Sequence, residues 1–392
     1  MNEGRTGIWF VGARGSVATT AAIGLAALAE GLIRPVGLTT AAPEFDGVEL
    51  PAFADLVVGG HDVDETPLLE RARRLAAGGM IAPATVEAVA MRLDAADAAI
   101  RLVPRAARGS QQREIELRAD DIRAFRERNG LRRVVVIDVA STEPLPDDRP
   151  EFHDRAALDA ALAEEGLELL PSSTVSAMAA LAAGAPYACF TPSTSLGIPA
   201  LQHAAIEAGV PVAGQDGKTG ETLLRTVLAP MFASRGMRVR SWAGANLLGG
   251  GDGATLADPA AVQSKLASKN RGLHDLLGHD VVTPLHIDNV PDLGDVKTAW
   301  DHVHAEGFLD TRITLQTTWT AYDSTLAAPL VIDLARLLSL ADEAGLAGPV
   351  PELGYFFKDP WGSDVHAFAR QADELVSWAL RTAVRRTAAQ VA

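Results

Sequence analysis

Lysine is rare in this chain, and each copy stands in a segment that could do chemistry. Of the 35 basic residues, 30 are arginines and five are lysines, namely Lys218, Lys265, Lys269, Lys297 and Lys358. A lysine ammonium is compact, changes its pKa readily on burial, and can hold an oxyanion, pass a proton or form a Schiff base, whereas the arginine guanidinium stays charged. Every lysine lies in a segment marked by Gly, Asp or Ser, as in GQDGKTGE and QSKLASKN, so we predict a shared chemical role.

The composition restricts the possible classes of function. With 392 residues, 48% of them hydrophobic, the chain is longer than one typical domain and can bury a large core. Its net charge of −15 argues against a general nucleic-acid binder and against a protein that binds anionic membranes. The single cysteine, Cys189, excludes a disulfide framework and a cysteine-based zinc site, and we predict no metal site.

Neither export nor membrane insertion is predicted. The N-terminus, MNEGRTGIWFVG, has no basic region ahead of an apolar stretch, as a signal peptide would have. The Ala-rich stretch 173–190 is interrupted by Gly184 and Pro186, so it does not indicate a membrane span. We therefore expect a cytoplasmic protein.

A glycine-marked turn near the N-terminus is the first candidate binding site. Residues 7–12 (GIWFVG) are typical of a buried parallel strand, and residues 16–32 predict a helix of small and aliphatic residues. The turn between them, GARGSV, keeps only the G-x-x-G part of the dinucleotide fingerprint. Backbone N–H groups and the positive end of a helix dipole at such a turn can bind a pyrophosphate, and a purely structural turn fits the same letters.

Four further apolar runs end in small, polar or acidic residues. These runs cover residues 56–60, 133–140, 187–190 and 211–213. Open α/β sheets bind their ligands just outside the carboxyl ends of parallel strands, where such residues would gather. We therefore predict an α/β protein with a doubly wound, Rossmann-type parallel sheet.

The remaining segments are assigned from their periodicity. Residues 64–130 give the weakest signal, and we interpret them as an insertion or outer helices, with helices at 65–77 and 84–100. Beyond residue 220 the patterns predict helices over 221–233, 259–277, 326–342 and 364–389, strands over 237–242, 281–288 and 311–319, and a glycine-rich turn at 246–253. Lys265 and Lys269 stand four residues apart in a predicted helix and share one face.

The segment 214–220 (GQDGKTG) resembles a phosphate-binding loop but lacks the P-loop pattern. A P-loop requires a glycine five residues before its Gly-Lys pair, and Val212 occupies that position. An ATPase or kinase is therefore not predicted. What remains is a glycine-opened loop at a helix start, which can hold a phosphate through its N–H groups with Lys218 nearby.

Taken together, the motifs resemble one family, the myo-inositol-1-phosphate synthases. The matching segments run in order from about residue 7 to about residue 365 and are GARGSV, GGHDV, VASTEP, PSSTVSA, TPSTS, GQDGKTG, LLGGGDG, SKLASK, GDVKTAWD, YDSTLAAPLVIDL and FFKDP. Agreement of all these motifs in one order is far more specific than any single one.

The resemblance implies a bound NAD and a redox-neutral cyclisation of a sugar phosphate. In the family, ring-opened glucose 6-phosphate is oxidised at C5, an enolate forms towards C6, C6 attacks the C1 aldehyde, and the C5 ketone is reduced again. An enolate and two alkoxides arise in turn, so preorganised cations are needed where negative charge develops. Protons also move at several atoms, which suits groups of tuned pKa.

By motif position the resemblance also implies roles for individual residues. The catalytic residues would be Lys265, Lys297, Lys358, Asp216 and Asp323. The substrate and its phosphate would be held by Lys269, Lys218, Thr219, Gly220 and Glu221, although Lys218 could instead make a structural contact to a neighbouring acid. NAD would be bound by Gly12, Ala13, Arg14, Gly15, Ser16, Val17, Asp62, Ala140, Ser141, Thr191, Asp216, Asn246 and Asp323.

Three departures from the family pattern put the substrate in question. Glu221 stands where the family commonly has Gln, and a carboxylate beside a phosphate is unfavourable unless it is protonated, turned away or paired. The Asn-rich loop of many members is replaced by residues 249–252 (GGGD), and Tyr322 stands where a smaller residue is usual. The alternatives are a related cyclase making a cyclopentane from fructose 6-phosphate, a plain NAD dehydrogenase, and a non-catalytic NAD-binding regulator.

The resemblance further implies a discontinuous, oligomeric arrangement. Residues 1–222 and 327–392 would form the NAD-binding domain, and residues 223–326 a second α/β domain for catalysis and oligomerisation. The second sheet would cover the nicotinamide and build the subunit interface. Family members are commonly tetramers, so we expect a homotetramer that acts on a small sugar phosphate.

Overall fold

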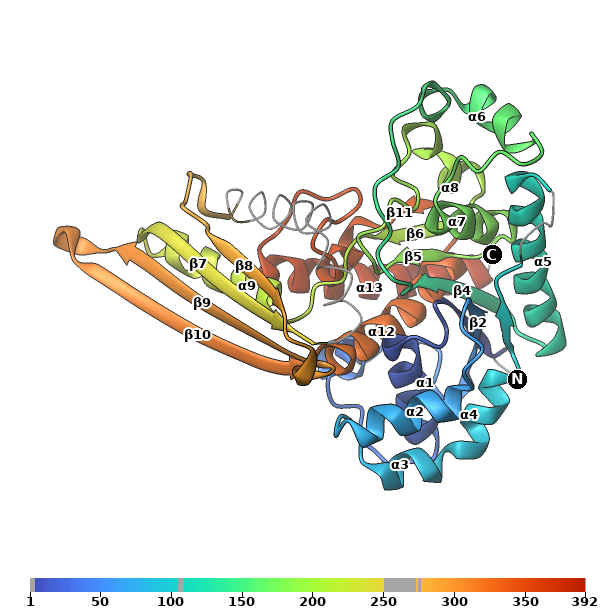
Figure 1. Cartoon of the computed structure of the whole chain (residues 1–392), viewed down its shortest axis with the longest axis horizontal. Helices are drawn as coiled ribbons and strands as arrows, with labels where there is room; N and C mark the ends of the chain where they lie inside the picture. Colours follow the sequence, from blue (N-terminus) through green and yellow to red (C-terminus); the bar gives the residue numbers. More distant parts are fainter. Residues whose placement is uncertain (1–3, 105–108, 250–272, 274–275, 392) are drawn as a thin grey trace.

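The computed structural model of the chain describes residues 4–104, 109–249, 273 and 276–391. Two sheets organise these residues, a large parallel sheet in the body and a smaller one that projects from it as an arm (Figure 1). Lys265 and Lys269, the loop residues 250–252, and residues 259–272 and 274–275 of the helix predicted over 259–277 lie outside the described residues.

The large sheet has seven parallel strands. In spatial order they are β11 (Gly348–Pro349), β6 (Pro211–Gly214), β5 (Tyr187–Cys189), β4 (Arg133–Asp138), β1 (Thr6–Val11), β2 (Leu56–Asp62) and β3 (Ile100–Leu102). The two central strands, β1 and β4, are buried along their whole length, because helices cover both faces of the sheet. The predicted Rossmann-type sheet is confirmed.

Each face of this sheet has its own hydrophobic core. Along β1, Ile8 and Phe10 point into one core and Trp9 and Val11 into the other, as the two-residue repeat of a strand requires. The first core is closed by helices α1 (Ser16–Ala29), α2 (Leu68–Ala77), α3 (Pro83–Ala88), α4 (Ala90–Asp97), α12 (Asp323–Glu343) and α13 (Phe368–Val391). The second is closed by α5 (Gln111–Arg128), α6 (Arg155–Leu162), α7 (Ser172–Ala182) and α8 (Ala204–Glu207).

The arm is a four-stranded mixed sheet. Its strands, in spatial order, are β10 (Arg312–Tyr322), β9 (Val296–Glu306), β7 (Arg238–Leu248) and β8 (Leu285–Asn289), and only β7 and β8 run parallel. Helix α9 (Gly220–Ser234) packs on one face through a small core that includes Phe232, Trp242 and Val303. Residues that alternate with this buried set, such as Trp300 at 38% exposure, point to the other face.

Helix α12 joins the arm to the body. Within the described part of the chain it is the one helix long and apolar enough to cross a membrane, but 78% of its most apolar window is buried inside the molecule. Its buried residues belong to the first core of the large sheet. Its hydrophobicity is therefore that of a core helix.

Several local predictions were wrong. Residues 64–130 do supply outer helices that cover the large sheet, but they are not helical throughout, because Ile100–Leu102 forms its edge strand β3. The helix predicted over 84–100 is two short helices followed by that strand. The strand β9 was not predicted, and Asn246–Leu248, predicted as a turn, continues strand β7. The domain boundaries at 222/223 and 326/327 fall inside α9 and α12, and the division stays a proposal.

Candidate active site

The first part of the site lies where the strand order of the large sheet reverses, between β1 and β4, which is where such sheets form a ligand-binding crevice. Gly12 follows β1 with a φ of 84°, and a Cβ placed on it would lie 2.8 Å from the Cα of Ala140, which follows β4. The N–H groups of Gly12 and Ala13 donate to the His61 carbonyl at 2.9 and 3.0 Å. Only glycine fits this contact, so the two loops meet closely at the carboxyl edge.

The start of α1 supplies donors for an anion at this crevice. The first helical hydrogen bond runs from Thr19 N to Gly15 O, so the N–H groups of Ser16, Val17 and Ala18 precede it. Gly15, the N-cap, offers no side chain, and the first turn holds no acid. The positive end of the helix is thus open to a phosphate, and these residues fit the pyrophosphate of a dinucleotide.

Asp62 and Arg14 shape this loop. The Asp62 carboxylate accepts hydrogen bonds from the backbone N–H groups of Arg14, at 2.6 Å, and Asp64, at 2.8 Å. The Arg14 guanidinium donates to Asp97 at 3.0 Å and to the Asp64 carbonyl at 2.8 Å. Both side chains are engaged within the protein, which fixes the turn between β1 and α1.

The first Lys–Asp pair of the candidate site lies after strand β6. Asp216 is buried and adopts a φ of 61°, and the Lys358 ammonium donates to its Oδ1 at 2.8 Å. The backbone N–H of Lys358 also donates to the Asp216 carbonyl at 2.7 Å, and the Asp216 N–H donates to the Thr191 carbonyl at 3.1 Å. Backbone contacts therefore place Asp216, Lys358 and Thr191, which come from three separate segments, at one point of the carboxyl edge.

The second pair bridges the arm and the body. Lys297 on β9 donates to Asp323 at the start of α12 at 3.2 Å, and the Thr219 hydroxyl donates to the other oxygen of Asp323 at 2.9 Å. Burial raises the pKa of Asp323, but the positive charge of Lys297, the Thr219 hydrogen bond and the charge of Lys358 outweigh it, so this pKa lies below its usual range. Thr219 contacts Asp323 and stands three residues after Asp216, so one loop connects the two Lys–Asp pairs.

Glu221, at the start of α9, is paired. Its carboxylate is 3% exposed, lies 2.6 Å from the Arg225 guanidinium, and accepts a hydrogen bond from Asn246 at 2.7 Å. The same guanidinium nitrogen lies 3.1 Å from Asp301, which also accepts the Trp242 indole N–H at 2.7 Å. Burial, followed by the negative charge of Glu221, raises the pKa of Asp301. Asn246 thus belongs to this buried network.

Lys218 points away from both Lys–Asp pairs. It is 4% exposed, donates to the Gln371 side-chain carbonyl on α13, and lies 5.8 Å from the centre of the Phe368 ring. Burial lowers its pKa to about 7. Among the described residues its partner is an amide, so the alternative of a neighbouring acid was wrong.

The sequence reasoning missed Arg225, Asp301 and Trp319. The first two complete the Glu221 network, and the spacing of Glu221 and Arg225, four apart in a helix, was a signal available in the sequence. The Trp319 indole nitrogen is buried without a partner among the described residues, and it lies 3.5 Å from a Cβ placed on Gly220. Arg225, Asp301 and Trp319 therefore add polar groups near the end of the loop 214–220.

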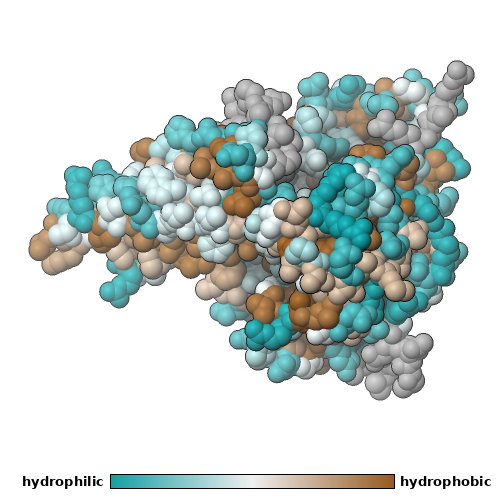
Figure 2. Space-filling view, turned by 60° about the horizontal axis from the view of Figure 1, so that its bottom comes forward, coloured by the Kyte–Doolittle hydropathy of each residue, from teal (hydrophilic) through white to brown (hydrophobic). Residues whose placement is uncertain are grey.

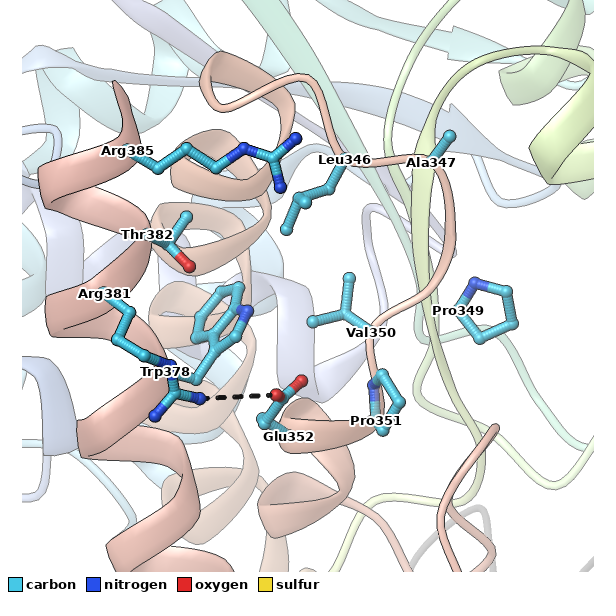
Figure 3. Close-up of a pocket in the computed structure, with 10 residues that line it drawn as sticks. All are labelled: Leu346, Ala347, Pro349, Val350, Pro351, Glu352, Trp378, Arg381, Thr382 and Arg385. Carbon is cyan, nitrogen blue, oxygen red and sulfur yellow. Dashed lines mark ion pairs between the residues drawn. The ribbon is translucent and has the colours of Figure 1, made fainter. Parts of the chain in front are cut away.

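A cavity of about 360 Å³ opens elsewhere on the molecule (Figure 3). Its floor includes Trp378, and Arg381 of α13 pairs with Glu352 across it at 3.9 Å. Its lining also includes Leu346 and Ala347, which precede β11, and Val350 and Pro351, which follow it. No residue predicted for the site lines this cavity, so it is not the catalytic crevice.

Comparison with known proteins identifies the family. Residues 6–381 match the family model described as myo-inositol-1-phosphate synthase. The chain belongs to the myo-inositol-1-phosphate synthase family. It is 31% identical to inositol-3-phosphate synthase 1 of Bacteroides thetaiotaomicron, over 94% of this chain and 92% of that protein. It is 34% identical to the inositol-3-phosphate synthase of Drosophila melanogaster, over 60% of this chain but only 43% of that protein.

A solved structure of the family shares the fold. The inositol-3-phosphate synthase of Caenorhabditis elegans superposes with a TM-score of 0.85, covering 97% of this chain and 86% of that one, at 24% identity. The predicted family, the fold class and the NAD cofactor are therefore confirmed, and the chain is an NAD-binding enzyme of the synthase family.

Proposed function

We propose that this enzyme converts glucose 6-phosphate into 1L-myo-inositol 1-phosphate by a redox-neutral cyclisation. The observation that carries the proposal is the gathering of two Lys–Asp pairs, Lys358–Asp216 and Lys297–Asp323, at the carboxyl edge of an NAD-binding sheet. The chemistry that NAD supplies when bound is removal of a hydride from the substrate and its later return.

The residues around the β1–β4 crevice would hold the dinucleotide. The first turn of α1, with Gly15, Ser16 and Val17, would bind the pyrophosphate through backbone N–H groups. The turn held by Asp62, together with the side of the crevice formed by Ala140, would keep these donors in place. The remaining residues proposed to line the site are Gly12, Ala13, Arg14, Ser141, Thr191, Asp216, Asn246 and Asp323.

The lysines would stabilise the charges that develop on the substrate. Enolisation puts negative charge on the C5 oxygen, and ring closure puts it on the C1 oxygen, so two oriented ammonium groups match the two positions. Lys297 and Lys358 are oriented by the carboxylates that they contact. The same groups would give and take protons at these oxygens. Lys265 is proposed as a third catalytic lysine on the basis of its motif.

The start of α9 would bind the substrate phosphate. Thr219 is its N-cap, and Gly220 and Glu221 begin the helix, so the leading N–H groups face the loop that carries Asp216. Lys269 is proposed to add a positive charge. Lys218 is proposed to support the loop from the side of α13, since its ammonium contacts Gln371.

Two departures from the family pattern are compatible with glucose 6-phosphate. The Glu221 carboxylate faces Arg225 and Asn246 and is not free to repel a phosphate. The hydroxyl of Tyr322 donates to the Gly78 carbonyl at 3.4 Å, at the end of α2, and so points away from Thr219 and Lys297. These contacts remove two objections to glucose 6-phosphate as the substrate.

Product analysis tests the proposal. The enzyme with NAD is given glucose 6-phosphate or, separately, fructose 6-phosphate, and products are followed by phosphorus and carbon NMR. Inositol phosphate from glucose 6-phosphate supports the proposal. A new carbocycle from fructose 6-phosphate alone, or net accumulation of NADH, contradicts it and points to the related cyclase or to a dehydrogenase.

We also propose that the arm mediates assembly into a tetramer. At its tip, Phe308 and Leu309 are 86% and 79% exposed, and Figure 2 shows hydrophobic colour at that end of the molecule. Trp300 points from the face opposite α9. Exposed apolar side chains of this kind are typical of protein interfaces. Light scattering on the parent and on Phe308→Glu tests the proposal, and a smaller particle is expected for the variant.

A further inference from the structure

One arginine holds two carboxylates beneath the phosphate-binding end of α9. Arg225 Nη2 lies 2.6 Å from Glu221 and 3.1 Å from Asp301, and all three side chains are at most 5% exposed. Asn246 closes the network by donating to Glu221 at 2.7 Å. Among the described residues, Arg225 is the cation that contacts both acids, and its positive charge offsets part of their negative charge.

The cluster also holds polar atoms whose hydrogen bonds are not made within the described residues. Arg225 Nε and Nη1 and Asn246 Oδ1 are buried and have no partner there. Arg225 contacts Glu221 in the first turn of α9 through Nη2, and its other two nitrogens could still donate hydrogen bonds. A buried cation in this position acts on any anion bound at the helix end, because the local dielectric constant is low.

An acid at the start of α9 competes directly with a phosphate. Glu221 is the second residue of the helix, and a carboxylate in the first turn is attracted to the same N–H groups that a phosphate would use. Two negative groups at one helix end also repel each other. In this structure the contact with Arg225 draws the carboxylate inward, towards β7 and β9.

We propose that Arg225 is a positioning residue that lets this enzyme bind a phosphorylated sugar despite an acidic residue in its phosphate loop. Arg225 neutralises Glu221 and keeps it away from the N–H groups of α9, while Asp301 and Asn246 fix the guanidinium. Glu221 and Arg225 act as one unit in place of the family's common glutamine. The inference rests on the proposed function only in placing the phosphate at the start of α9.

Binding measurements on single and double variants test the unit. Calorimetry measures the dissociation constants of glucose 6-phosphate and inorganic phosphate for the NAD-loaded enzyme, with glucose as the uncharged probe. The variants are Glu221→Gln, Arg225→Met, Arg225→Lys and the double variant Glu221→Gln/Arg225→Met. Arg155→Met is the matched control, because Arg155 also contacts two carboxylates, Asp159 and Glu207, but is 43% exposed.

The expected pattern is electrostatic. Arg225→Met weakens phosphate binding at least ~10-fold, because Glu221, within one helical turn of the anion, then loses the positive charge that Arg225 places beside it. Glu221→Gln binds phosphate several-fold more tightly, Arg225→Lys lies between Arg225→Met and the parent, and the double variant returns to within about 3-fold of the parent. Glucose binding and the Arg155→Met control stay unchanged.

Three results overturn the inference. These are unchanged phosphate binding in Arg225→Met, a double variant as weak as Arg225→Met alone, and equal losses for glucose and for phosphate. If Arg225→Met does not fold, Glu221→Gln provides the test. Weaker or unchanged phosphate binding in Glu221→Gln contradicts the proposal that the charge of Glu221 opposes phosphate binding. The readout is binding, so the expected pattern can hold even if product analysis reveals a different sugar phosphate as the substrate.

Discussion

Replacing Lys358 by alanine should nearly abolish turnover. Coulomb's law with an effective dielectric constant of about 20 gives an upper bound of about 6 kcal/mol for unit charges at the 2.8 Å that separates Lys358 from Asp216. The lysine and aspartate side chains are 19% and 12% exposed, so solvent reduces this value. If the charge acts on the transition state as one oxyanion-hole donor does, its loss costs about 3–4 kcal/mol, or roughly 100- to 1000-fold in kcat.

The assay is the rate of inositol phosphate formation by phosphorus NMR at saturating NAD and substrate. Lys358→Ala also leaves Asp216 without its cation, so the melting temperature should fall as well. The variant Asp216→Asn/Lys358→Ala separates these effects, because it should regain stability but not activity. A folded Lys358→Ala enzyme with a rate within about 10-fold of the parent would refute the reasoning.

Four further predictions concern other parts of the site. Lys297→Ala and Lys297→Arg should both lose at least ~100-fold in turnover, since a guanidinium keeps the charge but cannot pass protons; an active Lys297→Arg enzyme would contradict this. The folded-state pKa of Asp323 is lowered, so its contribution to stability is present above its ordinary value of 3.8 and lost as pH falls below it. The free energy of unfolding of Asp323→Asn, measured with denaturant, should accordingly decrease less at acidic pH than that of the parent. Burial lowers the pKa of Lys218 from 10.5 to about 7, so at this residue the unfolded chain binds more protons in this interval, and the contribution of Lys218 to parent stability should rise with pH across it. Lys218→Met should flatten that rise in the same unfolding experiment, and an unchanged slope would show that Lys218 titrates normally. Gly12→Ala should weaken NAD binding in a fluorescence titration, because position 12 has a positive φ and no room for a Cβ, whereas Gly24→Ala, with nothing within 4 Å, should bind as the parent does.

The large sheet could be predicted from the sequence because its strands are buried on both faces. Runs such as residues 134–137 (VVVI) are continuously apolar, and the polar residues that follow them mark the carboxyl edge. The arm was harder to predict. Strand β9 (VKTAWDHVHAE) mixes Lys, Asp and His with apolar residues, since its buried positions include Asp301 and its other face is partly exposed. This mixture hides the alternation on which a strand prediction depends.

The site residues were predicted by motif, and their partners were not. The contacts of Lys358 with Asp216 and of Lys297 with Asp323 join residues 142 and 26 positions apart, which a single sequence cannot reveal. Lys218 shows most clearly what a sequence cannot predict. Its segment suggested a residue that binds the substrate, whereas its burial against Gln371 and Phe368 depends on tertiary packing. The pairing of Glu221 with Arg225 was accessible from helix periodicity alone.

The most direct test of the central claim is the number of turnovers that each NAD molecule supports. The enzyme is supplied with glucose 6-phosphate in large excess over NAD, inositol phosphate is measured by phosphorus NMR, and NADH is measured by its absorbance. A redox-neutral cyclase yields many molecules of inositol phosphate for each NAD, with no net NADH. Oxidised product that stops at one equivalent of NAD, with NADH rising in step, would contradict the account and identify a dehydrogenase.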